Sequence, residues 1–197
     1  MSRPILPRVG AMSGALFVVL LLVSGDGDGT ALIVLHLTAF LLFLPFIACL
    51  CGVLREAEGG TGWVSGLAFA AAVLGIGVKY GSVAVVIAAR NLEEGTAIER
   101  AFADVGAAAY MISLLPLALC LGAVAVVALR SRALPRWLAI GSALVAVALA
   151  VNGTFIDAEY GPAFLLFLAW TLAASLVLLS GARAEQTQRA RAAAVAA

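Results

Sequence analysis

The chain has 197 residues, of which 64% are hydrophobic and 12% charged, and its mean hydropathy is +1.13. Soluble domains are only about half apolar, so this composition excludes a soluble globular protein. The net charge is +1 and the arginines are spread between apolar segments, which excludes a basic patch for nucleic acid. We expect an all-α integral membrane protein, because several apolar runs of about 20 residues are each long enough to cross a bilayer.

Six apolar segments follow one another along the chain. The first, residues 5–24, is expected to be a retained membrane helix. A cleaved signal peptide is the alternative, because the segment has a basic start and small residues at Val23-Ser24-Gly25. The sequence predicts one six-transmembrane-helix bundle over residues 1–182, then a cytoplasmic Ala- and Arg-rich tail at 183–197. The remaining spans are expected at about 31–54, 63–89, 105–129, 136–154 and 162–181.

Local signals mark several helix ends. Thr96-Ala-Ile-Glu99 matches the S/T-x-x-E capping box, which predicts that the fourth helix begins there, before its membrane portion. Pro135 and Pro162 suit the first turns of the fifth and sixth helices, where a missing N–H is not needed for a helical hydrogen bond. Trp63, at the start of the third helix, is expected at the membrane interface.

The arginines predict the orientation. With both termini on the cytoplasmic side, nine arginines fall in cytoplasmic segments and only two, Arg90 and Arg100, fall outside. Cytoplasmic loops of membrane proteins carry an excess of basic residues, so this distribution predicts an N-in, C-in bundle in the cell membrane.

The chain's single lysine, Lys79, lies in an otherwise uncharged, largely apolar run from Trp63 to Ala89. A cation near mid-membrane costs about 2.5–3.5 kcal/mol on insertion scales, so it normally faces a protein interior or a watery cavity. Gly75, Gly77 and Gly81 surround it, and the last two form a small-xxx-small pair that lets another helix approach closely. We expect the other helices to pack around this segment.

Polar residues are predicted to share the outer third of the membrane. At 1.5 Å per helical residue, Asn152 falls at nearly the height of Lys79, and His36 and Tyr110 fall near the outer boundary. Ser82 follows Lys79 in a stripe of mostly small or polar residues that we expect to line an outward-facing cavity. Three alternatives remain: Lys79 snorkels to the surface, His36 is a hydrogen-bonded packing residue, and Tyr110 belongs to the outer aromatic belt.

These features predict binding or transport of a small anionic solute or a lipid in the cavity, with Lys79 as the charge partner. The alternative is an accessory or structural subunit that packs against another membrane protein, or a second copy, through Gly- and Ala-rich helix faces. No GxSxG, HExxH or P-loop pattern occurs, and there is one histidine. The sequence therefore predicts no catalytic residue, metal site or cofactor.

The segment Leu134-Pro-Arg-Trp-Leu138 combines a helix start, a basic residue and an interfacial tryptophan, with a basic loop before it and a small-residue helix after it. In this motif the chain resembles a family of small uncharacterised bacterial integral membrane proteins with six predicted spans. The resemblance extends loosely over most of the chain. It implies the six-span fold and brings no established function or catalytic residues.

Overall fold

The computed structural model describes residues 5–25, 29–90, 92–93, 95–155 and 161–196, with side chains for 8–25, 29–90, 92–93, 95–154 and 161–181. The regular elements among these residues are all α-helices, which confirms the predicted all-α class. The helices are α1 (Ile5–Ser24), α2 (Thr30–Glu58), α3 (Trp63–Ala89), α4 (Ala97–Ser131), α5 (Arg136–Phe155) and α6 (Pro162–Ala196).

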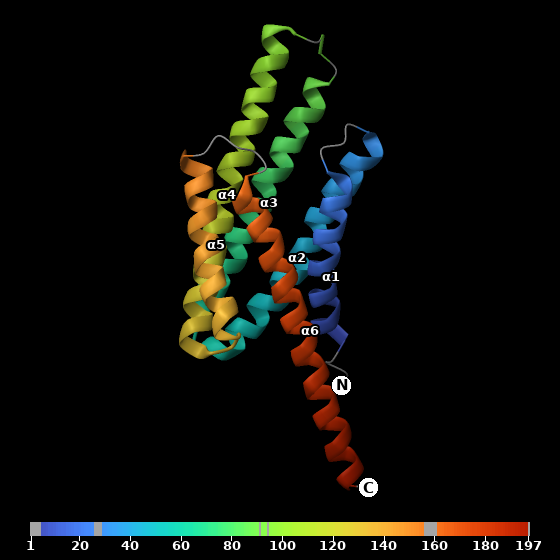
Figure 1. The fold of residues 1–197 in the computed structure, drawn as a ribbon, viewed down its shortest axis with the longest axis vertical. Helices are drawn as coiled ribbons and strands as arrows, with labels where there is room; N and C mark the ends of the chain where they lie inside the picture. The colour runs from blue at the N-terminus through green and yellow to red at the C-terminus, as the bar shows by residue number, and fades with distance from the viewer. Residues whose placement is uncertain (1–4, 26–28, 91, 94, 156–160, 197) are drawn as a thin grey trace.

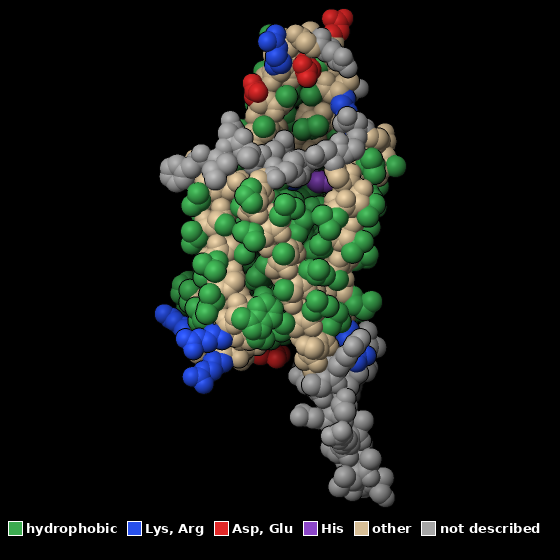
Figure 2. Space-filling view, viewed as in Figure 1, with side chains coloured by type: hydrophobic (Ala, Val, Ile, Leu, Met, Phe, Trp, Pro, Cys, Tyr) green, Lys and Arg blue, Asp and Glu red, His purple; other side chains and the backbone are tan. Residues whose placement is uncertain are grey.

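Helices α2 to α6 are long and apolar enough to cross a membrane, whereas the part of α1 with described side chains, Arg8–Ser24, forms a shorter apolar helix. Five candidate spans are therefore present among the described residues, against the six that the sequence predicts. Figure 2 shows hydrophobic side chains over the middle of the visible face and charged side chains toward its two ends. This distribution fits a chain that lies in a lipid bilayer.

One of the two hydrogen bonds of the predicted capping box is present at the start of α4, while the Thr96 N–H donates to the Glu93 carbonyl oxygen at 3.4 Å. The Thr96 side-chain oxygen accepts a hydrogen bond from the Glu99 backbone N–H at 3.1 Å, and the helix begins at Ala97. The sixth helix begins at Pro162, as predicted, and it continues to Ala196 without a break at the predicted tail (Figure 1). The side chains of that tail lie outside the described residues.

A carboxylate closes the turn between α2 and α3. Glu58, the last residue of α2, accepts hydrogen bonds from the backbone N–H groups of Val64 and Ser65 at 3.2 and 3.0 Å. The Ser65 hydroxyl donates a third, at 2.6 Å. A negative charge that accepts the first N–H groups of a helix stabilises its start, because those groups have no partner inside the helix.

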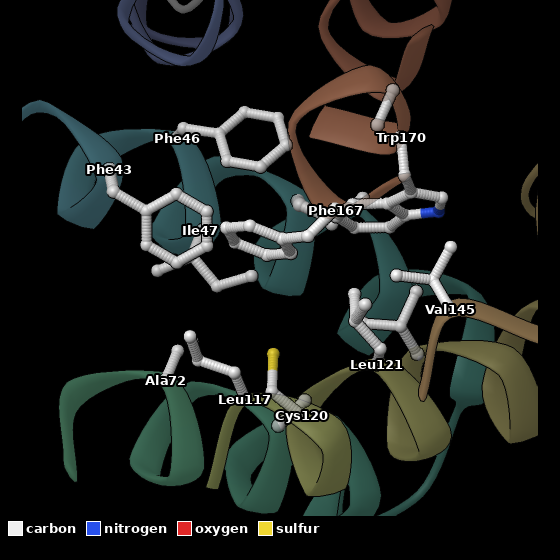
Figure 3. Packing of buried hydrophobic residues seen from close by; sticks show 14 of the residues in the cluster. Phe43, Phe46, Ile47, Ala72, Leu117, Cys120, Leu121, Val145, Phe167 and Trp170 are labelled. Atoms are coloured by element: carbon white, nitrogen blue, oxygen red, sulfur yellow. The ribbon is translucent and has the colours of Figure 1, made fainter. Parts of the chain in front are cut away.

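The most extensive contacts between helices join α3 to α4, α4 to α5 and α1 to α2, while α6 contacts α1 and α5. Figure 1 shows α3 and α4 continuing beyond the other helices at one end of the bundle. Aromatic side chains from α2 and α6 fill the middle of the bundle (Figure 3), among them Phe43, Phe46 and Phe167. The Trp170 indole N–H donates to the Ser142 hydroxyl at 2.9 Å, which joins α6 to α5.

The glycines of α3 differ in burial and in their neighbours. Gly75 is buried, and a Cβ added there would lie 3.0 Å from the Leu117 side chain of α4. Gly77 and Gly81 are exposed, and within the described part of the chain no heavy atom lies within 4 Å of a Cβ added at either. The close helix contact predicted for this pair is therefore not made inside the described chain.

The tightest glycine contacts belong to α1 instead. A Cβ added at Gly10 would come within 3.0 Å of the Cys49 side chain on α2. One added at Gly14 would come equally close to Phe46 on α2 and Ser175 on α6. The two glycines have the Gly-x-x-x-Gly spacing that lets helices approach closely, so α1 is packed into the bundle along this face.

Candidate functional site

Lys79 is buried inside the bundle, with 5% of its surface exposed. Its ammonium nitrogen lies over the ring of Tyr110. It is also 5.8 Å from the centre of the Phe40 ring and 6.0 Å from that of Phe164. Helices α2, α4 and α6 thus each contribute one aromatic ring around a cation from α3, and we call these three rings the aromatic cage.

The aromatic cage explains how a cation is accommodated among apolar helices. The face of an aromatic ring attracts a cation, and one such contact contributes about 2 kcal/mol or more when the pair is desolvated. Tyr110 and Phe164 also contact each other edge to face, with ring centres 6.2 Å apart. Lys79 does not reach the protein surface, so the snorkelling alternative does not describe its position.

Ser82 lies one turn from Lys79 on α3 and is 4% exposed. Its hydroxyl donates to the Lys79 carbonyl oxygen at 2.7 Å. Across from it, a Cβ added at Gly106 of α4 would lie 3.7 Å from the Ser82 carbonyl oxygen. The structure therefore places Ser82 in the interface between α3 and α4, and the outward-facing cavity beside it stays a prediction.

Tyr110 is 3% exposed, so it does not belong to an outer aromatic belt. The hydroxyl of Ser113, one turn further along α4, donates to the Tyr110 carbonyl oxygen. Asn152, on α5, is 1% exposed. Its neighbour Gly153 packs against α4, where an added Cβ would lie 3.0 Å from the Met111 carbonyl oxygen. Tyr110 and Asn152 are thus both buried where α4 meets its neighbours.

His36 lies at the edge of this region, between α1 and α2. Its Nδ1 atom is 3.3 Å from the Ser24 hydroxyl of α1, and its ring meets the Phe40 ring edge-on at 5.0 Å between centres. Phe40 is therefore a neighbour of both His36 and Lys79. Of the predicted site residues, Tyr110 contacts the Lys79 ammonium group through its ring, and the Ser82 hydroxyl donates to the Lys79 carbonyl oxygen. His36 is linked to Lys79 only through the Phe40 ring, which lies near both.

Phe40 and Phe164 were not predicted as site residues. Both lie toward the ends of apolar segments on the side where Lys79 was expected, and counting depth along each helix would have placed them near its height. The direction in which they point could not be read from the sequence. Each helix presents apolar residues to lipid as well as to protein, so the pattern does not mark the inner face.

No protein-family model, curated protein or solved structure matches the chain. The resemblance suggested by Leu134–Leu138 stays a prediction, so the function is inferred from the site alone.

Proposed function

We propose that this chain is a multi-pass protein of the cell membrane with six spans and both termini in the cytoplasm, and that it binds a small ligand with an anionic group at Lys79. Transport of that ligand is part of the same proposal. The observation that supports it is the burial of the Lys79 ammonium group inside the aromatic cage, between four helices.

Stability alone gives little reason for a buried cation. Replacing buried charged groups by well-packed apolar residues is often neutral or stabilising, because desolvation of a charge is costly. The attraction between a bound anion and a cation is stronger in this low-dielectric setting than it would be in water. The rings of the aromatic cage would contact the apolar part of the same ligand, as in most small-molecule sites. A small amphipathic carboxylate or phosphate fits both features.

The test uses purified protein in detergent and three probes: benzoate, decanoate and inorganic phosphate. We expect at least one probe to raise the melting temperature of the wild-type protein. Lys79→Met should fold and lose that shift, because it keeps the length of the side chain and removes its charge. Lys79→Arg, which keeps the charge, should retain part of the shift.

Two outcomes would contradict the proposal. If Lys79→Met keeps its stability and every ligand-dependent shift seen in the wild type, Lys79 does not bind the anionic group. If none of the three probes shifts the wild-type melting temperature, the anionic ligand class is wrong.

A third substitution distinguishes the contribution of the aromatic cage to binding from that of the Lys79 charge. Phe164→Leu should weaken the shift by benzoate and decanoate more than a shift by phosphate.

A second candidate function is supported by the outer face of α3. Gly77 and Gly81 are exposed there at small-xxx-small spacing. We infer that, if the chain is an accessory subunit, this face packs against a helix of a membrane partner or of a second copy. Gly81→Leu should then abolish copurification of the partner in mild detergent, whereas Gly52→Leu, at an exposed glycine of α2, should leave it intact. A stoichiometric partner without any ligand response would favour this function over the first.

A further inference from the structure

The surface of the bundle carries a groove that is separate from the Lys79 site. It has a volume of about 650 Å³ and lies where α3, α4 and α5 meet. The residues that line it are apolar except Arg130, which lies at one end. Neither Lys79 nor any residue of the aromatic cage lines this groove.

Small residues on α4 create the hollow. Gly122 lines it, and among the described residues no heavy atom lies within 4 Å of a Cβ added there. Leu115 and Leu119 wall the groove toward one end, and Val126 lies toward the other. From Leu115 to Arg130 the groove follows α4 for about 22 Å at 1.5 Å per residue. That is longer than one leaflet of the hydrocarbon core, which is about 15 Å.

The polar end of the groove is basic. Arg130 is exposed in the last turn of α4, and Arg132 and Arg136 are exposed in and just after the turn that leads to α5. Trp63 lines the groove at the same end and is 67% exposed. The basic patch at the lower left of Figure 2 lies over the α4–α5 turn, where the hydrophobic surface ends.

Basic residues beside an apolar groove between membrane helices are typical of sites for anionic lipid headgroups. An interfacial tryptophan next to them is typical of the headgroup level.

We propose that the groove binds an anionic phospholipid, with its phosphate against Arg130 and one acyl chain along α4. A thin, flexible acyl chain can lie along the 22 Å of apolar lining on α4, and the basic residues at one end supply a partner for the phosphate of the same molecule. The inference does not depend on a ligand at Lys79.

The test compares phosphatidylglycerol, phosphatidylcholine with the same acyl chains, and inorganic phosphate as probes of the purified protein. Bound lipid is counted by native mass spectrometry. We expect phosphatidylglycerol to be retained in preference to phosphatidylcholine. Arg130→Gln should weaken its binding about fivefold, the usual effect of one basic residue near an anionic headgroup. Arg100→Gln, at the far end of α4, should not change it.

Gly122→Leu tests the acyl chain independently of charge. Its Cβ meets no neighbour, so the larger side chain should enter the groove without disturbing the fold, and lipid retention should fall severalfold. The matched control is Gly52→Leu, whose added Cβ is equally open but lies on α2. A normal melting temperature for both variants shows that the fold is intact.

Several results would overturn the proposal. Equal retention of the two lipids, or unchanged retention in both Gly122→Leu and Arg130→Gln, means that the groove does not select an anionic lipid. If inorganic phosphate alone competes fully with phosphatidylglycerol, the site binds phosphate and not a lipid. Cross-linking of Gly122→Cys to a second polypeptide in native membranes would show that a protein occupies the groove.

Discussion

Replacing Gly14 by alanine tests whether close backbone contact holds α1 in the bundle. A Cβ at this position would come within 3.0 Å of the Phe46 side chain and of the Ser175 hydroxyl. Both of these residues are fully buried, Phe46 on α2 and Ser175 on α6. Neither side chain can move away without disturbing its own packing, so we expect Gly14→Ala to displace α1 and destabilise the protein.

The size of the effect follows from two opposing contributions. Overpacking a well-packed core costs about 1–3 kcal/mol, and alanine recovers about 1 kcal/mol of helix propensity relative to glycine. Because the added methyl group meets two buried neighbours at once, the cost should lie near the upper end. We expect a net loss of about 2 kcal/mol, which corresponds to a fall in melting temperature of about 4–8 °C for a chain of this size.

The measurement is thermal unfolding of purified variants in one detergent. Gly52→Ala is the matched control, because it is the same chemical change at an exposed helical glycine with no described neighbour within 4 Å. It should melt at or slightly above the wild-type temperature. Gly10→Ala should behave like Gly14→Ala, since its Cβ would press on Cys49. If Gly14→Ala melts at the same temperature as Gly52→Ala, the inference that close backbone contact at Gly14 holds α1 in the bundle is wrong.

Three further predictions concern hydrogen bonds and topology. Tyr80→Phe removes the hydrogen bond that the Tyr80 hydroxyl donates to the Leu37 carbonyl oxygen, so the free energy of unfolding should fall by about 1 kcal/mol. An unchanged melting temperature would mean that this link between α2 and α3 does not stabilise the fold. Thr96→Ala removes the cap on the Glu99 N–H and should cost about 1 kcal/mol, seen as faster amide exchange confined to the first turn of α4. A periplasm-active reporter should work within residues 91–96 and be silent at both termini, and activity at either terminus refutes the N-in, C-in orientation.

The sequence determined the helices and several of their ends. Apolar runs located all six helices, and the Thr96 cap and Pro162 lie at the starts of α4 and α6 as predicted. A single lysine in an apolar run identified Lys79 as a residue that the bundle must accommodate, because a charge is costly in hydrocarbon. These inferences succeeded because they depend on neighbours in the chain or on the identity of one residue.

The tertiary structure decided which face of each helix is inside. Gly77 and Gly81 were predicted to pack and are exposed, while Gly10 and Gly14, with the same spacing, are packed. In a soluble protein, polarity separates the two faces of a helix. In a membrane both lipid and neighbouring helices are apolar, so hydrophobic periodicity cannot distinguish them.

The aromatic cage has the same origin. Phe40, Tyr110 and Phe164 come from three helices, and only the packing of those helices brings their rings to the ammonium group of Lys79. Residues far apart in the chain meet through the crossing of helices, which the sequence of any one helix does not specify. The sequence alone thus identified the buried charge, and the tertiary structure decided what surrounds it.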